Sequence, residues 1–375
     1  MSNTSLRGHT VHPDTPPRPP HTKWGVAVLI GVGAAAAVAL IVIAFLWPTK
    51  ALTAQNLPVS ISGSPAVVSA FETAVDEHSP GTFDWVKADD RSDAVHQIKT
   101  RETYGAIVLP AAQGQLPEVL TAPAGSSIAT QLLGVMAGQL QAQVTAQVTA
   151  AGGNPAGAVV KTTAVVPLSS DDPTGAGLTA SAFPMMMGGM IGGILISLLV
   201  VGPVRRLAAL AGLAVAVGIG IPLILQTWFG FLQGDFWLNA AAIGLSVLAT
   251  ASFIVGCTSL IGRAGIAIGA VVTMLVGNPL SAAAVPVQFV PTPWGEIGQF
   301  MVPGASNWLV RSLSYFPDAD VSKQWWILGT WAAVGILLTI VGHFRSQEPV
   351  HVPDATLEHE PEHAAGAAAP ALNPA

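Results

Sequence analysis

Apolar residues divide the chain into one hydrophobic stretch near the N-terminus, a long mixed segment and a hydrophobic C-terminal half. Apolar runs lie at residues 24–46, 182–201, 207–225, 238–261, 264–285 and 325–341. Each is close to the roughly 20 residues that a helix needs to cross a bilayer. The pattern predicts six transmembrane helices, one plus five, with a long insertion after the first helix.

The inserted segment, residues 51–178, alternates short apolar runs with amphipathic ones. We predict strands at 57–61, 83–86, 104–109, 118–121 and 159–166, and helices at 65–75, 92–100 and 127–148. The predicted fold class is a polytopic α-helical membrane protein with an inserted extracytoplasmic α/β domain.

Composition agrees with this prediction, because 51% of the residues are hydrophobic, only 10% are charged and the mean hydropathy is +0.57. A soluble domain of this length could not bury so much apolar surface. The predicted layout is a disordered tail (1–22), a first transmembrane helix (23–47), the α/β domain (51–178), a five-helix membrane domain (182–343) and a second disordered tail (346–375).

The positive-inside rule orients the chain in the plasma membrane. The first apolar run is too long for a signal-peptide core and lacks a small-residue cleavage site, so we expect it to remain as an anchor. With both termini cytoplasmic and residues 51–178 outside, most basic residues near the span ends lie inside: Arg7, Arg18, Lys23, Arg205, Arg206, Arg263 and Arg345. The basic residues in the outer flanks are Lys50, Arg311 and Lys323.

The sequence gives no support for an enzyme, a metal or a cofactor. Residues 359–363 match the zinc-protease pattern HExxH, but Pro361 lies inside the helical turn which that chemistry needs. The acidic cluster, Asp84, Asp89, Asp90 and Asp93, lacks calcium-loop spacing and is interpreted as a solvated loop with a helix cap at Ser92 or Asp93. His78 and His96 are expected to be surface residues. Net charge is −6 without a basic stripe, which argues against a nucleic-acid partner.

The residue types in the apolar runs restrict how transport could be coupled to an energy source. They contain no Asp, Glu or His, which disfavours a proton-driven or sodium-driven transporter. Their polar residues are mild and are expected to bond locally: Ser197, Ser246, Thr250, Ser252 and Thr273. The chain lacks a phosphate-binding GxxxxGK[ST] loop, so any ATP hydrolysis must come from a separate subunit.

The second apolar run combines methionines and glycines: Met185, Met186, Met187, Gly188, Gly189, Met190, Gly192 and Gly193. Glycines four residues apart favour close helix packing. A second interpretation, compatible with the first, is a pliable path lined by methionine for an apolar substrate.

The segment 286–323 between the last two runs is rich in Pro and aromatic residues. We expect short interfacial helices here, with rings at headgroup depth. A break at Pro303 and Gly304 precedes residues at helical spacing, Trp308, Leu309, Leu313 and Phe316. We predict a short amphipathic helix whose Arg311 faces headgroups or the exported domain.

Residues 301–316 (MVPGASNWLVRSLSYF), followed by KQWWIL at 323–328, resemble the C-terminal signature of ABC transporter type-2 permeases. Together with the strand GAIVLP at 105–110 and the one-plus-five layout, they are most similar to the phage-infection-protein-like branch. The resemblance implies paired permease halves, a cytoplasmic ATPase docked between the second and third spans, and outward movement of amphiphilic cargo. The chain departs from that pattern at residues 202–206, which are too short for a coupling helix.

The leading interpretation is a permease-like component of an exporter for lipidic or amphiphilic cargo. Its expected partners are the lipid bilayer, an ATPase that contacts Arg205 and Arg206, and a second copy or paired permease. The alternative is a membrane-anchored surface or secretion-accessory protein whose exported domain binds a partner.

Overall fold

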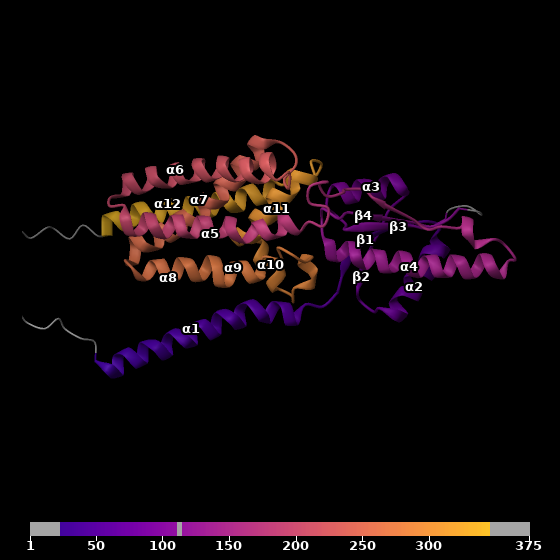
Figure 1. Cartoon of the computed structure of the whole chain (residues 1–375), viewed down its shortest axis with the longest axis horizontal. Coiled ribbons are helices and arrows are strands. Elements are labelled where there is room, and N and C mark those ends of the chain that lie inside the picture. Colours follow the sequence, from indigo (N-terminus) through magenta and orange to yellow (C-terminus); the bar gives the residue numbers. More distant parts are fainter. Residues whose placement is uncertain (1–22, 111–114, 346–375) are drawn as a thin grey trace, which may run out of the picture. The chain divides into compact units, whose positions relative to one another are not determined.

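The computed structural model describes residues 23–110 and 115–345 (Figure 1). Contacts divide the chain into two units, residues 1–50 and 51–375, which are described separately. The first unit consists of most of helix α1 (Trp24–Ala51). None of the most apolar window of α1 is buried. A helix of this length with apolar side chains on all sides requires lipid or a partner helix around it.

The second unit begins with a five-stranded sheet of order β2-β1-β3-β4-β5. Its strands are β1 (Leu57–Ser62), β2 (Phe83–Lys87), β3 (Gly105–Val108), β4 (Glu118–Thr121) and β5 (Lys161–Ala164). The helices between them are α2 (Pro65–His78), α3 (Arg91–Lys99) and α4 (Ser127–Ala150), with the short turn η1 (Pro155–Gly157). All eight strands and helices predicted for this segment are confirmed, with small shifts in their ends. The strand pairs are parallel except for β3 with β4, as expected where helices connect neighbouring strands.

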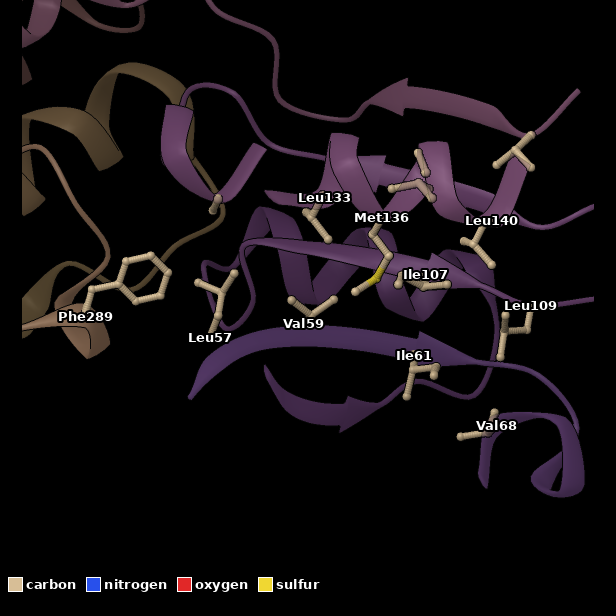
Figure 2. Close-up of a cluster of buried hydrophobic side chains, with 14 residues drawn as sticks. Leu57, Val59, Ile61, Val68, Ile107, Leu109, Leu133, Met136, Leu140 and Phe289 are labelled. Carbon is tan, nitrogen blue, oxygen red and sulfur yellow. The ribbon is translucent and has the colours of Figure 1, made fainter. Parts of the chain in front are cut away.

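Alternation along β3 and β4 separates two hydrophobic clusters, because successive side chains of a strand point to opposite faces. Leu57, Val59 and Ile61 belong to one cluster, with Ile107 of β3 and residues of α2 and α4 (Figure 2). The other cluster is rich in alanine and includes residues of α3, β3 and β4: Ala94, Ile98, Ala106 and Leu120. Helices therefore cover both faces of the sheet.

The start of α3 corrects one prediction. The N-cap is Asp90, whose carboxylate accepts hydrogen bonds from the backbone N–H groups of Ser92 and Asp93, so neither of those residues is the cap. His78 and His96 are exposed, as predicted.

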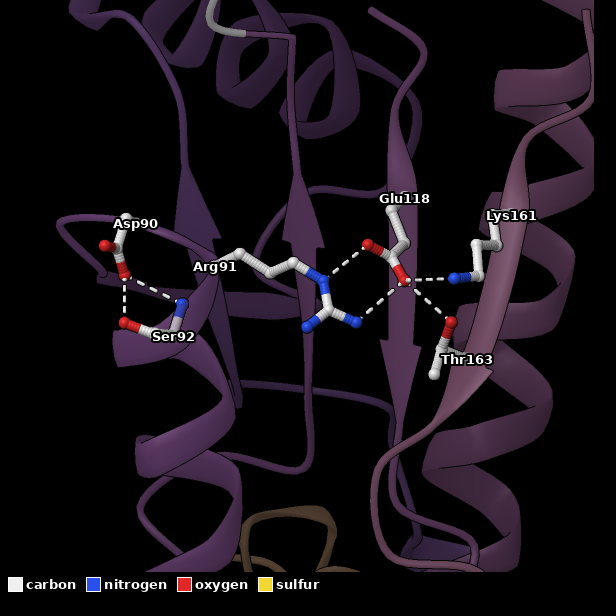
Figure 3. Close-up of polar contacts among 6 residues, drawn as sticks. All are labelled: Asp90, Arg91, Ser92, Glu118, Lys161 and Thr163. Atoms are coloured by element: carbon white, nitrogen blue, oxygen red, sulfur yellow. Dashed lines mark hydrogen bonds and ion pairs between the residues drawn. The ribbon is translucent and has the colours of Figure 1, made fainter.

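Glu118 of β4 connects α3 with β5 (Figure 3). Its carboxylate accepts hydrogen bonds from Arg91 Nε at 2.7 Å and Arg91 Nη2 at 3.0 Å. Thr163 Oγ1 of β5 donates to it at 2.7 Å, and Lys161 Nζ lies 3.8 Å away. The hydrogen bond from Arg91 lowers the pKa of Glu118, so the carboxylate is stabilised in its charged form.

Five helices of the described residues are long and apolar enough to cross a membrane. After α1 they are α5 (Ala176–Leu199), α6 (Pro203–Pro222) with its π-helical extension η2 (Leu223–Trp228), α7 (Phe236–Ile261) and α12 (Ser322–Arg345). Helix α7 packs against α5, α6 and α12 (Figure 1). It is 78% buried over its most apolar window, whereas the other three of this unit are 17–31% buried. Helix α7 is therefore the core of the helical part.

The predicted span 264–285 is shorter in the structure. It forms α8 (Ala264–Ala270), the π-helical η3 (Val271–Val276) and α9 (Gly277–Leu280). Pro279 lacks an N–H donor, which favours a wider turn before it, and Ala282 has a φ of 51° that ends the helix. Seventeen residues run from Ala264 to Leu280, about 25 Å at 1.5 Å per residue, which is less than a hydrocarbon core of roughly 30 Å.

The segment 286–323 contains η4 (Val287–Phe289), α10 (Trp294–Gln299) and α11 (Val302–Tyr315) before α12 begins. The predicted short helices are thus confirmed, but Pro303 and Gly304 lie in the first turn of α11 and do not precede it. Proline is favoured there because the first N–H groups of a helix have no partner inside it. The predicted domain limit at residue 178 likewise falls within the first turn of α5, since the last strand ends at Ala164.

The Glu118 contacts predict a pH-dependent stability. In the full chain in detergent, Glu118→Gln should lower the free energy of unfolding by about 1 kcal/mol at neutral pH. The folded pKa is lowered, so this contribution exists above the unfolded pKa and is lost as pH falls through the folded pKa. Thermal unfolding should show the variant and the native chain converging in acid. Glu77→Gln, at an exposed position of α2, is the control; an equal loss there would contradict the assignment.

Candidate functional site

Helix α11 is enclosed by other elements of the protein, and its position at the membrane interface stays a prediction. Within the described chain, no residue from 302 to 316 is exposed. The helix packs against α7, α9, α10 and α12. A helix buried on all sides is a core element, so α11 forms part of the interior where the sheet meets the membrane helices.

Two aromatic rings from this segment enter the hydrophobic clusters of the sheet. Phe289, 4% exposed, joins the cluster around β1 and lies near Leu57 (Figure 2). Phe316, 3% exposed, joins the alanine-rich cluster on the other face. Segment 286–323, which was predicted to lie among headgroups, therefore packs against both faces of the sheet through these two rings.

Arg101 follows α3 and reaches α11. Its Nη1 donates to Ser312 Oγ at 2.7 Å and to Trp308 O at 3.2 Å. Its guanidinium carbon lies 3.5 Å from the centroid of the Trp308 ring and 4.9 Å from that of Phe316. Burial lowers the pKa of Arg101 to about 9, which leaves the side chain charged at neutral pH.

Arg311 extends from α11 in the opposite direction, to the sheet segment. It is 9% exposed, and its Nη1 donates to Ala124 O at 2.9 Å and to Gly125 O at 3.4 Å. Of the two environments predicted for Arg311, the structure shows the contact with the α/β segment. Two arginines thus cross the same junction from opposite sides.

Both arginines line a polar recess together with Tyr104, the start of α4 and the loop after α9. Burial raises the pKa of Tyr104, so its hydroxyl is neutral at neutral pH. The recess contains ≈ 430 Å³ of space between atoms, part of it open to solvent, of which ≈ 30 Å³ accommodates the centre of a water molecule. Its remaining lining is mostly small or polar: Thr179, Ser281, Ala282, Ala283, Ala284, Gln299 and Asn307.

A second, mainly apolar cavity adjoins the recess. It lies among the membrane helices and has Met185, Met186 and Pro303 in its wall. The space between atoms is ≈ 700 Å³, with ≈ 50 Å³ wide enough for a water centre. Four residues line both hollows: Ser281, Ala283, Asn307 and Arg311. The arrangement places two cationic groups at one end of an apolar cavity.

The glycines of α5 mainly serve packing. A side chain at Gly189 would meet Thr250 of α7 at 3.1 Å, and one at Gly193 would meet Ala251 at 2.9 Å. Gly192 lies against Leu213 of α6, whereas nothing lies within 4 Å of a side chain at Gly188. The packing interpretation is thus confirmed for three of these glycines. Met187 and Met190 are partly buried and line neither hollow.

Gly304 is also a close-packing position, because a side chain there would overlap the backbone of Gly298 in α10. The hydroxyl groups of the membrane helices bond as predicted: those of Ser197, Ser246, Thr250, Ser252 and Thr273 donate to carbonyl oxygens of their own helices.

The two arginines predicted as a docking surface differ in the structure. Arg205 is exposed. Arg206 donates from Nε to Val200 O at 2.9 Å, and from Nη1 to Ser259 Oγ at 2.8 Å. Arg206 therefore joins α5, α6 and α7. Reversing the charge of Arg206 would remove the donors to Val200 O and Ser259 Oγ, whereas the same change at the exposed Arg205 would not.

Several sequence predictions fall outside the described residues, namely those on Arg7, Arg18, Ser346, the HExxH pattern at 359–363 and both tails. Arg101 is the main site residue that sequence reasoning missed. It follows the helix 91–99 with a φ of 64°, a left-handed conformation unusual for arginine. A basic residue after a short helix is common, so the sequence held no clear signal for its contact with α11.

The long apolar helices define the class of this protein as an α-helical membrane protein. No protein-family model, curated protein or solved structure matches the chain.

The ring contacts predict a stability difference within one segment. Phe316→Ala should lower the free energy of unfolding by about 3 kcal/mol or more, because it empties a closely packed site. Phe300→Ala removes the same atoms from a side chain that is 53% exposed and should cost less than about 1 kcal/mol. Thermal unfolding of the purified chain measures both. Equal losses of unfolding free energy in the two variants would show that the Phe316 ring does not stabilise the packing between the sheet and α11.

Proposed function

We propose that the chain is a permease-like component of an exporter for lipidic or amphiphilic cargo. The observation that supports this most directly is the apolar cavity of α5, α7 and α11, with a polar recess beside it. An amphiphile has an apolar and a polar part, which match the two hollows. Met185 and Met186 add adaptable side chains to the apolar wall.

The proposal includes six spans, in which the helical stretch from Ala264 to Leu280 counts as the short fifth one, with both termini cytoplasmic and the sheet outside. It places the recess toward the outer side of the membrane, between the sheet and the helices. ATP hydrolysis comes from a separate subunit, for which Arg205 is the exposed basic contact. Resemblance to type-2 permeases supports this organisation. A second copy or a paired permease completes the assembly.

The alternative, a membrane-anchored protein whose sheet segment binds a partner, also has an observation in its favour. A groove lies along α2 and α4, lined by Phe71, Val75, Met136, Leu140 and Val144. The space between its atoms is ≈ 1530 Å³, part of it open to solvent, of which ≈ 630 Å³ accommodates the centre of a water molecule. Such a groove could receive an apolar segment of another protein. The exporter function requires the cavity among the membrane helices, whereas the partner-binding function does not.

A cavity-filling variant separates the two functions. Ser306→Phe places a ring into the apolar cavity, whereas Ser322→Phe adds the same ring at an exposed position. In a deletion strain complemented with each variant, the amphiphiles extractable from the cell surface are measured by mass spectrometry. We expect Ser306→Phe to resemble the deletion and Ser322→Phe to resemble the native chain. Normal surface lipids with folded, membrane-inserted Ser306→Phe would favour the partner-binding alternative.

Topology is tested by cysteine labelling in a Cys257→Ser background, since Cys257 is the only cysteine. Ser92→Cys in α3 and Thr149→Cys in α4 are at exposed positions and should react with a membrane-impermeant reagent in intact cells. Ser306 is not used for labelling, because it lines the apolar cavity. Ser346→Cys should react only after permeabilisation. Labelling of Ser346→Cys in intact cells would exclude the proposed six-span topology.

A further inference from the structure

We propose that the recess between Arg101, Arg311 and the N-terminus of α4 is a binding site for a compact oxyanion, either a free phosphate or the anionic headgroup of an amphiphile. The headgroup source rests on the proposed function. The existence of the anion site does not, because its argument uses only charge, hydrogen bonding and geometry.

The charge balance around the recess favours a bound anion. In the part of the chain that the structure describes, the ion pairs are those of Glu118 with Arg91 and Lys161, so neither Arg101 nor Arg311 has an acidic partner within 4.0 Å. Asp172 acts on Arg311 electrostatically, but its carboxylate accepts hydrogen bonds from the N–H groups of Gly177 and Leu178 at the start of α5. Arg311 is 9% exposed and Arg101 is partly buried, and two guanidinium groups in such surroundings without a close counter-charge are costly. A bound anion would offset that cost.

As far as the chain is described, Arg101 and Arg311 also have guanidinium N–H groups that are free to donate hydrogen bonds. Each arginine makes its hydrogen bonds within the described residues through Nη1 alone. The Trp308 ring lies against the flat face of Arg101 and leaves the in-plane N–H groups available. A planar fork of donors is the arrangement that binds phosphate and carboxylate groups best.

The N-terminus of helix α4 adds a further anion-binding feature to the recess. Helix α4 has 24 residues and no acidic residue in its first turn, and Gly125, Ser126 and Ser127 at its start line the recess. Ser126 Oγ accepts from Ala129 N, while the backbone N–H groups of Ser127 and Ile128 have no acceptor among the described residues. Unpaired N–H groups and the helix dipole favour an anion at such an end. Helix and arginines therefore converge on one recess with the same sign of charge.

The size of the recess selects the ligand. Only ≈ 30 Å³ of the recess accommodates the centre of a water molecule, so a bound group must be compact. The adjoining apolar cavity shares Arg311 with the recess, so a chain attached to a bound headgroup has an apolar path beside it. A phosphate or carboxylate headgroup with an apolar chain fits both features.

Anion binding is tested by thermal unfolding of the full chain in nonionic detergent at neutral pH. Sodium phosphate is compared with sodium chloride at equal ionic strength. A parallel series uses zwitterionic nanodiscs with and without phosphatidylglycerol. We expect a saturable rise in the unfolding temperature with phosphate, with the anionic lipid, or with both. Response to phosphate identifies a free oxyanion as a ligand, and response to the lipid alone identifies a headgroup.

The informative variant is Ser127→Asp. It places a carboxylate in the first turn of α4, where the helix dipole favours it, so the fold should be preserved. The added charge competes with the anion and should raise its half-saturating concentration by about tenfold or more. Ala66→Asp adds the same charge to the first turn of α2, away from the recess, and should respond like the native chain.

Two outcomes would overturn the site. One is the absence of any stabilisation by phosphate or anionic lipid. The other is an equal response of Ser127→Asp and Ala66→Asp, which would assign the effect to general charge screening. Because this measurement involves neither export nor an ATPase, it can succeed where the cavity-filling experiment fails, and the reverse.

Discussion

The junction between the sheet and α11 is the constraint on which the remaining structure depends. Phe289 and Phe316 enter the clusters on the two faces of the sheet, and Arg101 and Arg311 cross between them in opposite directions. Apolar burial supplies the attraction, while the guanidinium groups add hydrogen bonds to backbone carbonyls across the junction. These contacts place a charged recess directly beside the apolar cavity of the helices.

Helix α7 lines that cavity and is the most buried of the long apolar helices in the described chain. Small residues permit close approach of its neighbours, since Gly189 and Gly193 of α5 lie against Thr250 and Ala251. Hydroxyl groups on these helices donate hydrogen bonds to carbonyl oxygens of their own helices, so they need no partner from elsewhere in the bundle. The polar chemistry is consequently concentrated at the junction, where α11, the loop after α9 and the start of α4 meet. This separation of polar and apolar surfaces is consistent with the proposed amphiphilic cargo.

Arg206 illustrates how the same residue type has different roles at two ends of the helices. It donates to Val200 O and Ser259 Oγ, so its charge is used to connect three helices. Arg311 also donates to carbonyls, but it lies beside a second guanidinium group and the start of α4. The surplus of donors and positive charge, and not the presence of an arginine alone, distinguishes the proposed anion site.

Sequence alone determined the elements whose signals are local. Apolar runs and alternating strands predicted the α5, α6, α7 and α12 helices and all five strands, because length and periodicity depend on neighbouring residues. The cap of α3 and the end of α9 were misplaced by a few residues, because Asp90 caps α3 and the left-handed backbone of Ala282 ends the helix before it. Tertiary structure alone decided that α11 is enclosed and that Arg101, from a sheet segment some two hundred positions earlier in the chain, meets Trp308 and Ser312. Such contacts depend on how distant elements pack, and neither hydropathy nor spacing encodes the side on which a buried helix receives its partners.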